Sequence, residues 1–205
     1  MQDPLSSVVF DLGNVLIDWN PRYLYRKLFD GDEAAMEDFL ARVCTSDWNA
    51  QQDAGRSCEM ATAERITEFP HLAPLISAYY QRWPEMLGGS IPDTVELLEE
   101  LSKLDLALYA LTNWSHETFP VARQRFPFLD LFDGIVVSGE ERLIKPAPAL
   151  YRRLLQRFDI QPESALFIDD VAANVEGAQA VGMHAVHFAG AEELRASLRQ
   201  FGVNV

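Results

Sequence analysis

Apolar residues along the chain gather in short runs that have the length of β-strands. Five such runs are rich in Val, Ile, Leu and Phe and are bounded by turn or helix signals: Ser7–Asp11, Leu106–Thr112, Gly134–Ser138, Ala165–Asp169 and His184–Phe188. Apolar residues fill them almost continuously. This pattern is typical of strands that are covered by helices on both faces, as in a parallel sheet.

Between these runs, the apolar residues recur with the spacing of a helix. The segments with such an apolar face are Pro92–Leu104, Ala147–Phe158 and Val171–Val181. Strand and helix alternate from about residue 90 onward, and this alternation favours right-handed βαβ units. The pattern therefore predicts an α/β fold with a Rossmann-like, doubly wound parallel sheet.

The stretch from about Asp18 to Gly89 has a different pattern, without a convincing strand. It indicates three or four helices, among them Arg22–Phe29, Glu33–Val43 and Leu72–Met86. We therefore predict a small all-helical cap domain, residues 18–89, inserted after the first strand. Residues 1–17 and 90–205 form the predicted α/β core domain.

The composition of the 205-residue chain is that of a globular protein, with 48% hydrophobic and 23% charged residues. No apolar run approaches the roughly 20 residues that a membrane helix needs. Met1–Ser7 has neither a basic patch nor the apolar core of a secretion signal. Cys44 and Cys58 are too few for a disulfide framework and lack the paired spacing of a zinc site. These features predict a cytoplasmic protein with free thiols and no membrane partner.

The formal net charge of −14 argues against nucleic acid as a partner, because phosphate backbones bind basic surfaces. A small anionic substrate would need a local positive field from a metal ion, a lysine or helix N-termini. We predict such a substrate. The sequence is compatible with either a monomer or a homodimer.

Polar residues that directly follow the predicted strands are the first candidates for a site, because ligands of open parallel sheets bind beyond the carboxyl ends of the strands. Three segments supply them directly, namely Asp11, the Thr112–Asn113 pair and the Asp169–Asp170 pair, and a fourth supplies Lys145 beyond the third strand. The topology thus brings carboxylates, a hydroxyl, an amide and one lysine to a single edge of the sheet.

This combination of groups suits a phosphate ester. Carboxylates alone would repel a phosphate dianion, and clustered carboxylate oxygens favour a hard cation such as Mg²⁺. Lys145 adds a positive charge, while Thr112 and Asn113 offer hydrogen bonds to phosphoryl oxygens. An aspartate with a pKa of about 3.9 is ionised at neutral pH. Asp11 can therefore attack directly and form a covalent intermediate that water then cleaves.

Four segments, in this order, resemble the motifs of the haloacid dehalogenase superfamily: Phe10–Leu16, Leu111–Asn113, Lys145–Pro146 and Phe167–Asp170. Together they are specific, and the resemblance covers nearly the whole chain. It implies an α/β core in which the helical insertion is similar to the family's C1-type cap. The first motif is similar to that of the sugar-phosphate phosphatase branch.

The resemblance also implies roles for individual residues. Asp11 would be the nucleophile. The residues that would bind the phosphoryl group are Thr112, Asn113 and Lys145. The residues that would bind magnesium are Asp11, the backbone carbonyl of Gly13 and Asp169, with Asp170 next to the metal or bound to it through water. Asn174 is a weaker candidate for orienting these groups.

Gly13 departs from the pattern of the family. Typical phosphatases of this superfamily have an aspartate at this position, where it serves as general acid and base, and losing such a group costs about 10²–10⁴ in rate. A carboxylate from the cap side, Asp18 or Asp53, is one replacement. The alternatives are that the substrate has a good leaving group, that the protein catalyses a different reaction, or that it catalyses no reaction.

The cap contributes further candidates. Asp53–Arg56 resembles an acidic-x-Gly loop that approaches the site in capped relatives, so Arg56 could bind an anionic substrate. Trp19, Trp48 and Trp83 could line the cavity. On sequence alone, the two loop charges are better explained as solvated and the tryptophans as core residues.

Three functions remain open from the sequence. The first is a phosphatase of a small phosphorylated metabolite, with a sugar phosphate as one option. The second is a haloacid dehalogenase, in which Asp11 displaces halide from carbon without a metal. The third is a ligand-binding relative without turnover, which Gly13 keeps open. Both Asp169 and Asp170 are retained and Trp114 follows Asn113, and these features favour the phosphatase.

Overall fold

A five-stranded sheet forms the centre of the computed structural model, which describes residues 5–205. The strands run in the order β5-β4-β1-β6-β7, and every neighbouring pair is parallel. Their bounds are β1 Ser7–Phe10, β4 Ala107–Thr112, β5 Gly134–Val137, β6 Ala165–Asp169 and β7 His184–His187. These are the five predicted strands, and the predicted α/β fold class is confirmed. Residues 1–4, part of the segment examined for a secretion signal, lie outside the described residues.

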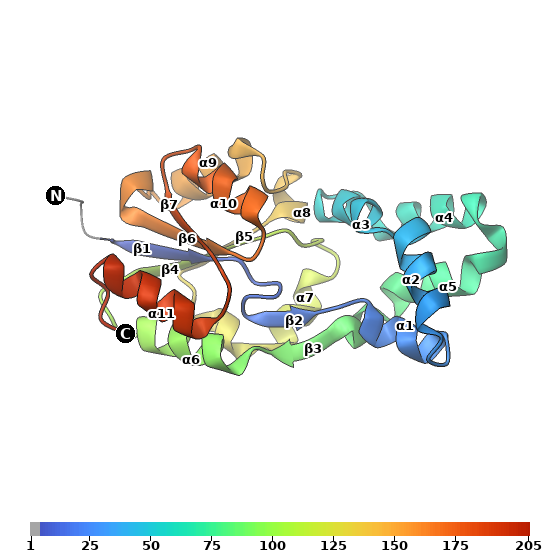
Figure 1. Cartoon of the computed structure of the whole chain (residues 1–205). Coiled ribbons are helices and arrows are strands. Elements are labelled where there is room, and N and C mark those ends of the chain that lie inside the picture. The colour runs from blue at the N-terminus through green and yellow to red at the C-terminus, as the bar shows by residue number, and fades with distance from the viewer. Residues whose placement is uncertain (1–4) are drawn as a thin grey trace.

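Helices cover both faces of this sheet (Figure 1). One face carries α9 Pro148–Arg157 and α10 Ala172–Gln179, and the other carries α6 Pro92–Leu101 and α11 Ala191–Gln200. Side chains alternate along the central strand: Val9 joins one hydrophobic cluster, while Val8 and Phe10 join the other. This arrangement explains why the strands are apolar at consecutive positions.

The insertion after the first strand lies beyond the carboxyl ends of the strands, at the right of Figure 1. Its five α-helices are α1 Arg22–Leu28, α2 Glu33–Arg42, α3 Ser46–Asp53, α4 Cys58–Glu68 and α5 Ala73–Gln81. The single helix predicted for Leu72–Met86 is wrong, because α5 ends at Gln81 and a 3₁₀ turn follows at Trp83–Met86. Pro84 lies in that turn, and proline lacks the N–H that a continuing α-helix would need.

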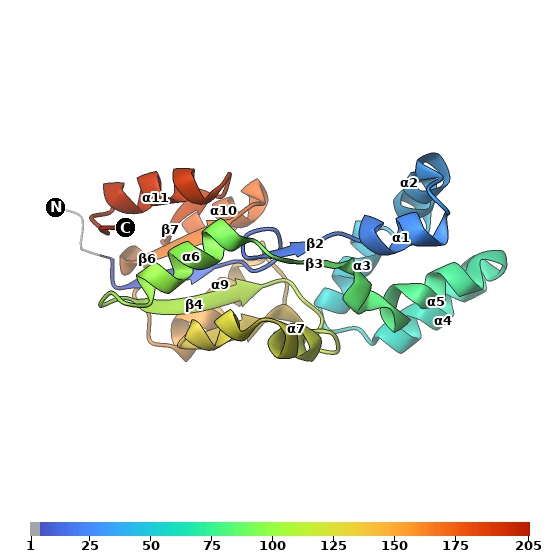
Figure 2. The same cartoon turned by 90° about the horizontal axis from the view of Figure 1, so that it is seen from below.

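The prediction that Asp18–Gly89 contains no strand is also wrong. β2 Ile17–Trp19 pairs with β3 Leu87–Ser90 in an antiparallel ribbon that joins the insertion to the sheet (Figure 2). Neither segment has the length or composition of a typical strand, so only their meeting in space creates the pairing. Gly88 leaves room there for the Asp18 and Tyr23 side chains, which an added Cβ would force to shift.

Aromatic packing holds the insertion together. Trp48 is buried and packs edge-on against Tyr79, with their ring centroids 5.1 Å apart. Trp48 is therefore a core residue of the insertion. Cys44 and Cys58 are both buried and free, as predicted. No helix within residues 5–205 has the length and apolarity that crossing a membrane requires.

Candidate active site

Three carboxylates converge where β1 and β6 end. Asp11 directly follows β1, Asp169 is the last residue of β6, and Asp170 comes next. The parallel register pairs Phe10 with Ile168, which places Asp11 and Asp169 side by side. One carboxylate oxygen from each of the three residues lies within 4.8 Å of the others. Asp169 is completely buried and Asp11 is 8% exposed.

Lys145 lies between two of these carboxylates. Its Nζ is 2.9 Å from Asp11 Oδ1 and 2.6 Å from Asp169 Oδ2, and it also donates to the Leu111 carbonyl at 2.9 Å. Burial alone would lower the pKa of Lys145, but the charges of Asp11 and Asp169 and their hydrogen bonds raise it above its usual value. The ammonium therefore stays charged, and it offsets the burial of the acids.

Burial raises the pKa of Asp11 to about 6, against the opposing effect of Lys145 and with a smaller raising effect from Asp169. Apart from its ion pair with Lys145, Asp11 Oδ1 has no hydrogen-bond partner among the described residues. Buried oxygens are normally fully paired. Hard carboxylate oxygens that are close together and incompletely paired form a site that could hold a divalent cation.

Hydrogen bonds fix the orientation of Asp169. Asn174 Nδ2 donates to both of its carboxylate oxygens, at 3.0 and 3.1 Å, and the Val171 N–H donates to Oδ1 at 2.9 Å. The Asn174 carbonyl in turn accepts from Tyr151 at 2.8 Å. Asn174 thus orients an acid of the cluster, in agreement with the role that the resemblance implies for it.

Asn113 and Thr112 end β4 beside this cluster. The Asn113 side chain binds the Lys145 backbone twice, accepting from its N–H at 2.8 Å and donating to its carbonyl at 3.1 Å. This pair ties the Lys145 loop to β4 and sets the position of the lysine. Thr112 is buried, with 1% of its surface exposed. Both residues therefore lie where the strand-end argument places them.

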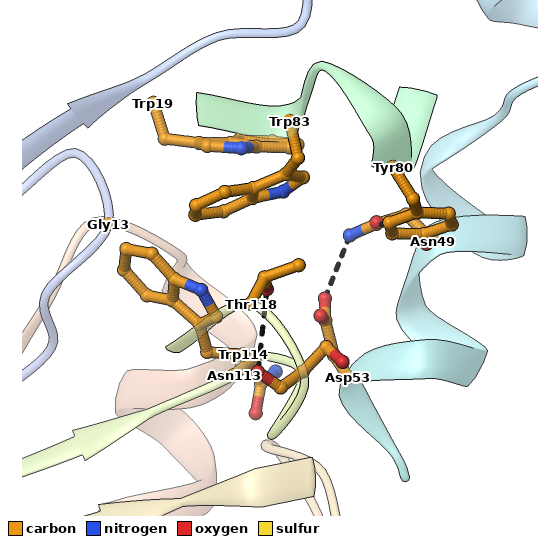
Figure 3. Close-up of a pocket in the computed structure, with 10 residues that line it drawn as sticks. Gly13, Trp19, Asn49, Asp53, Tyr80, Trp83, Asn113, Trp114 and Thr118 are labelled. Atoms are coloured by element: carbon orange, nitrogen blue, oxygen red, sulfur yellow. Dashed lines mark hydrogen bonds between the residues drawn. The ribbon is translucent and has the colours of Figure 1, made fainter. Parts of the chain in front are cut away.

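A pocket opens between the sheet edge and the insertion (Figure 3). Its lining residues are Gly13, Trp19, Asn49, Asp53, Tyr80, Trp83, Asn113, Trp114, Ser115 and Thr118. Two of the three tryptophans proposed for the cavity, Trp19 and Trp83, line it. Trp114 was not predicted to do so, although its position directly after the Leu111–Asn113 motif was a usable signal.

Arg56 is not brought to this pocket. Its guanidinium pairs with Glu64 and donates to Gln51 at 2.6 Å, and both partners belong to the insertion. It is not among the residues that line the pocket. The substrate contact suggested for Arg56 therefore has no support in this arrangement, because neighbouring helices already occupy its hydrogen-bond donors.

Asp53, in contrast, lines the pocket, so its description as a solvated loop charge is wrong. It is the last residue of α3, and its Oδ2 accepts from Asn49 Nδ2 at 2.9 Å. Burial raises the pKa of Asp53 to about 7, although a backbone hydrogen bond from Ser115 lowers it. Sequence position could not show this burial, because the surrounding residues come from other parts of the chain.

Comparisons with known proteins agree with this geometry. A family model described as haloacid dehalogenase-like hydrolase matches residues 5–182. The chain is 28% identical over 197 residues to a sesquiterpene phosphatase from Aspergillus oryzae, covering 95% of each protein. A phosphorylated carbohydrates phosphatase from Thermotoga maritima is 24% identical over 189 residues, covering 89% of this chain and 84% of the relative.

Among solved structures, a HAD family enzyme from Bacteroides thetaiotaomicron in complex with magnesium and inorganic phosphate has a similar fold. The TM-score is 0.68 at 21% identity, and the match covers 89% of this chain and 93% of that one. At this level of identity the similarity shows a common fold. The reaction has to be argued from the site itself.

Proposed function

Because the chain belongs to the haloacid dehalogenase-like hydrolases, we propose that it is a magnesium-dependent phosphoric monoester hydrolase. The observation that carries the proposal is the arrangement of Lys145 between Asp11 and Asp169, with Asp170 beside them. Relatives named as phosphatases support it. In this proposal, residues 18–89 act as a cap over the sheet edge.

In the proposed reaction, a carboxylate oxygen of Asp11 attacks phosphorus, and the bond to the ester oxygen breaks. Water then hydrolyses the aspartyl-phosphate and releases inorganic phosphate. Lys145, Thr112 and Asn113 bind the phosphoryl oxygens. Lys145 is already fixed by its ion pairs and by the hydrogen bonds between the Asn113 side chain and its backbone. Little reorganisation is therefore needed when charge develops in the transition state.

The donor set fits magnesium. Asp11, Asp169 and Asp170 would hold the ion together with the Gly13 carbonyl, since all supply hard oxygens and Asp11 Oδ1 has no partner besides the Lys145 ammonium among the described residues. When bound, magnesium supplies positive charge that reduces repulsion between these carboxylates and the phosphate. The overall charge of −14 makes such local compensation necessary.

The pocket indicates what kind of alcohol is esterified. Trp19, Trp83, Trp114 and Tyr80 form its walls, and no Lys, Arg or His is among its lining residues. The indole N–H of Trp114 is buried and has no partner among the described residues, so it can donate to one ligand oxygen. A small alcohol with a large apolar face matches these aromatic walls, and polar lining residues such as Asn49 and Thr118 can bind the few oxygens that such an alcohol carries.

The size of the pocket adds a second constraint. It holds about 70 Å³, well below the roughly 300–1,000 Å³ of typical small-molecule sites. A small group therefore fits the closed arrangement, whereas a bulkier alcohol requires the insertion to move away from the sheet.

The metal dependence of an aryl phosphatase reaction tests the proposal. Purified protein is expected to hydrolyse para-nitrophenyl phosphate with magnesium and to lose this activity in EDTA. Benzyl phosphate should be a better substrate than a hexose phosphate, because its ring matches the aromatic walls. Absence of aryl phosphate turnover with magnesium, combined with halide release from 2-chloropropionate, would contradict the phosphatase function and support the dehalogenase.

A further inference from the structure

The proposed hydrolysis requires a proton for the departing ester oxygen. An alkoxide is a poor leaving group, and a positioned acid accelerates such a step by about 10²–10⁴-fold. Gly13 occupies the position that supplies this acid in typical phosphatases of the superfamily, and it offers no proton. Provided that the proposed function holds, the proton has to come from another group at the site.

The pocket places an acid opposite the position left empty by Gly13. A Cβ added at Gly13 would meet nothing within 4 Å, so a side chain can start there without a clash. Figure 3 shows the Asp53 carboxyl group across the pocket from Gly13, between Asn49 and Thr118. A leaving group that extends from the sheet edge into the pocket would therefore pass close to Asp53.

A chain of hydrogen bonds holds this carboxyl group in place. Gln52 Nε2 donates to the Tyr80 hydroxyl at 3.1 Å, and Tyr80 donates to Asn49 Oδ1 at 3.1 Å. Asn49 Nδ2 then donates to Asp53 Oδ2 at 2.9 Å. The backbone of Asp53 is fixed as well, because its carbonyl accepts from Ser138 Oγ at 2.5 Å. An acid held from both ends is suited to directional proton transfer.

Burial outweighs a hydrogen bond from Ser115 and favours the protonated form of Asp53. Tyr79 and Tyr80 of α5 and Cys58 of α4 are its titratable neighbours, and burial raises the pKa of all three. They are therefore uncharged near neutral pH, and no cation is among the causes that shift the pKa of Asp53. Its value of about 7 is close to the value that suits proton transfer at neutral pH.

The other nearby acids have different partners. Asp18 accepts from the Tyr23 hydroxyl at 2.6 Å and is not among the residues that line the pocket. Glu117 accepts from the Cys58 N–H at 2.9 Å. Asp169 is bound by Lys145 and Asn174. Asp53 is therefore the one acidic side chain among the lining residues of the pocket.

We propose that Asp53 is the general acid and base of the reaction. As Asp11 forms its bond to phosphorus and the ester bond breaks, the proton of the Asp53 carboxyl moves to the leaving oxygen and yields the neutral alcohol. Asp53, now a carboxylate, takes a proton from the water that attacks the aspartyl-phosphate. This second transfer regenerates the starting form of the enzyme.

The test compares two esters whose leaving groups differ in their need for a proton. Asp53→Asn should lower kcat/KM on benzyl phosphate by about 10²–10⁴-fold but change kcat/KM on para-nitrophenyl phosphate by less than about tenfold, since nitrophenolate leaves without help and kcat/KM reports only the steps up to the aspartyl-phosphate. Asp18→Asn is the matched control and should behave like the wild type on both esters. For the wild type, kcat/KM on benzyl phosphate should fall as pH rises through about 7, and Asp53→Asn should lack this fall.

Two results would overturn the assignment of Asp53. An equal loss of kcat/KM on both esters would mean that Asp53 supports the structure of the site instead of donating a proton, and no loss of kcat/KM on benzyl phosphate would place the donor elsewhere. A wild type that hydrolyses neither ester with magnesium would contradict the phosphatase function itself. Activity of the wild type on para-nitrophenyl phosphate therefore separates the two failures.

Discussion

The sheet edge and the pocket under the insertion adjoin at Gly13 and Asn113, but their chemistry is opposite. At the sheet edge, Lys145 lies 2.9 Å from Asp11 and 2.6 Å from Asp169, so charge dominates. In the pocket, aromatic walls surround a single acid, Asp53. The phosphoryl group is the same in every monoester and suits a fixed, charged site. The alcohol differs between substrates, and a separate insertion can vary to match it.

The largest effect is expected for Asp11→Asn, which removes the proposed nucleophile from the charged region. Turnover of para-nitrophenyl phosphate should fall by at least about 10⁴-fold, because an amide cannot form the covalent intermediate. Asp130→Asn, on the exposed surface, is the control and should retain full activity. A thermal unfolding transition should confirm that Asp11→Asn is folded. Near-normal rates in the folded variant would rule out the covalent mechanism.

Lys145→Met should destabilise the fold as well as reduce activity. The substitution leaves Asp11 and Asp169 buried without their cation, and breaking a buried ion pair costs about 3–5 kcal/mol. Urea unfolding of the metal-free protein measures this loss, with the exposed Lys103→Met as the control. A loss within about 0.5 kcal/mol, as at ordinary surface sites, would show that the carboxylates reprotonate or rehydrate without cost.

Gly13→Asp tests whether the two regions share the proton-transfer task. The Cβ of the added side chain would meet nothing within 4 Å, so in an Asp53→Asn background it should restore benzyl phosphate turnover by about tenfold or more. In the wild-type background the gain should be small, because Asp53 already supplies the proton. A lack of rescue, with para-nitrophenyl phosphate turnover intact, would mean that an acid at position 13 cannot reach the leaving oxygen.

Arg56→Ala should have the smallest effect. Its guanidinium pairs with Glu64 and Gln51 away from the pocket, and partly exposed ion pairs contribute about 0–1 kcal/mol. KM and kcat for both aryl and benzyl phosphate should stay within about twofold of the wild type. A KM that increases more than about tenfold would indicate that Arg56 changes partner when substrate binds.

The charged region could be predicted closely from the sequence. Asp11, Thr112 and Asp169 each follow or end an apolar run, Lys145 lies in the connection after the third predicted strand, and parallel strands bring their carboxyl ends to one edge whatever the details of packing. Strand positions were predicted equally well, because continuous apolar runs are a local signal of a buried strand. The sequence by itself therefore determined the sheet, its functional edge and the residues gathered there.

Tertiary structure alone decided the rest. The ribbon of β2 and β3 forms because two connections of weak strand character meet in space. The sequence does not distinguish Trp48 from Trp19, yet packing buries Trp48 in the insertion and places Trp19 on the wall of the pocket. Asp53 and Arg56 are three residues apart and both partly buried, yet the packing of α3 turns Asp53 into the pocket and leaves Arg56 paired with Glu64 outside it. Burial and pKa depend on neighbours distant in the chain, which local pattern does not encode.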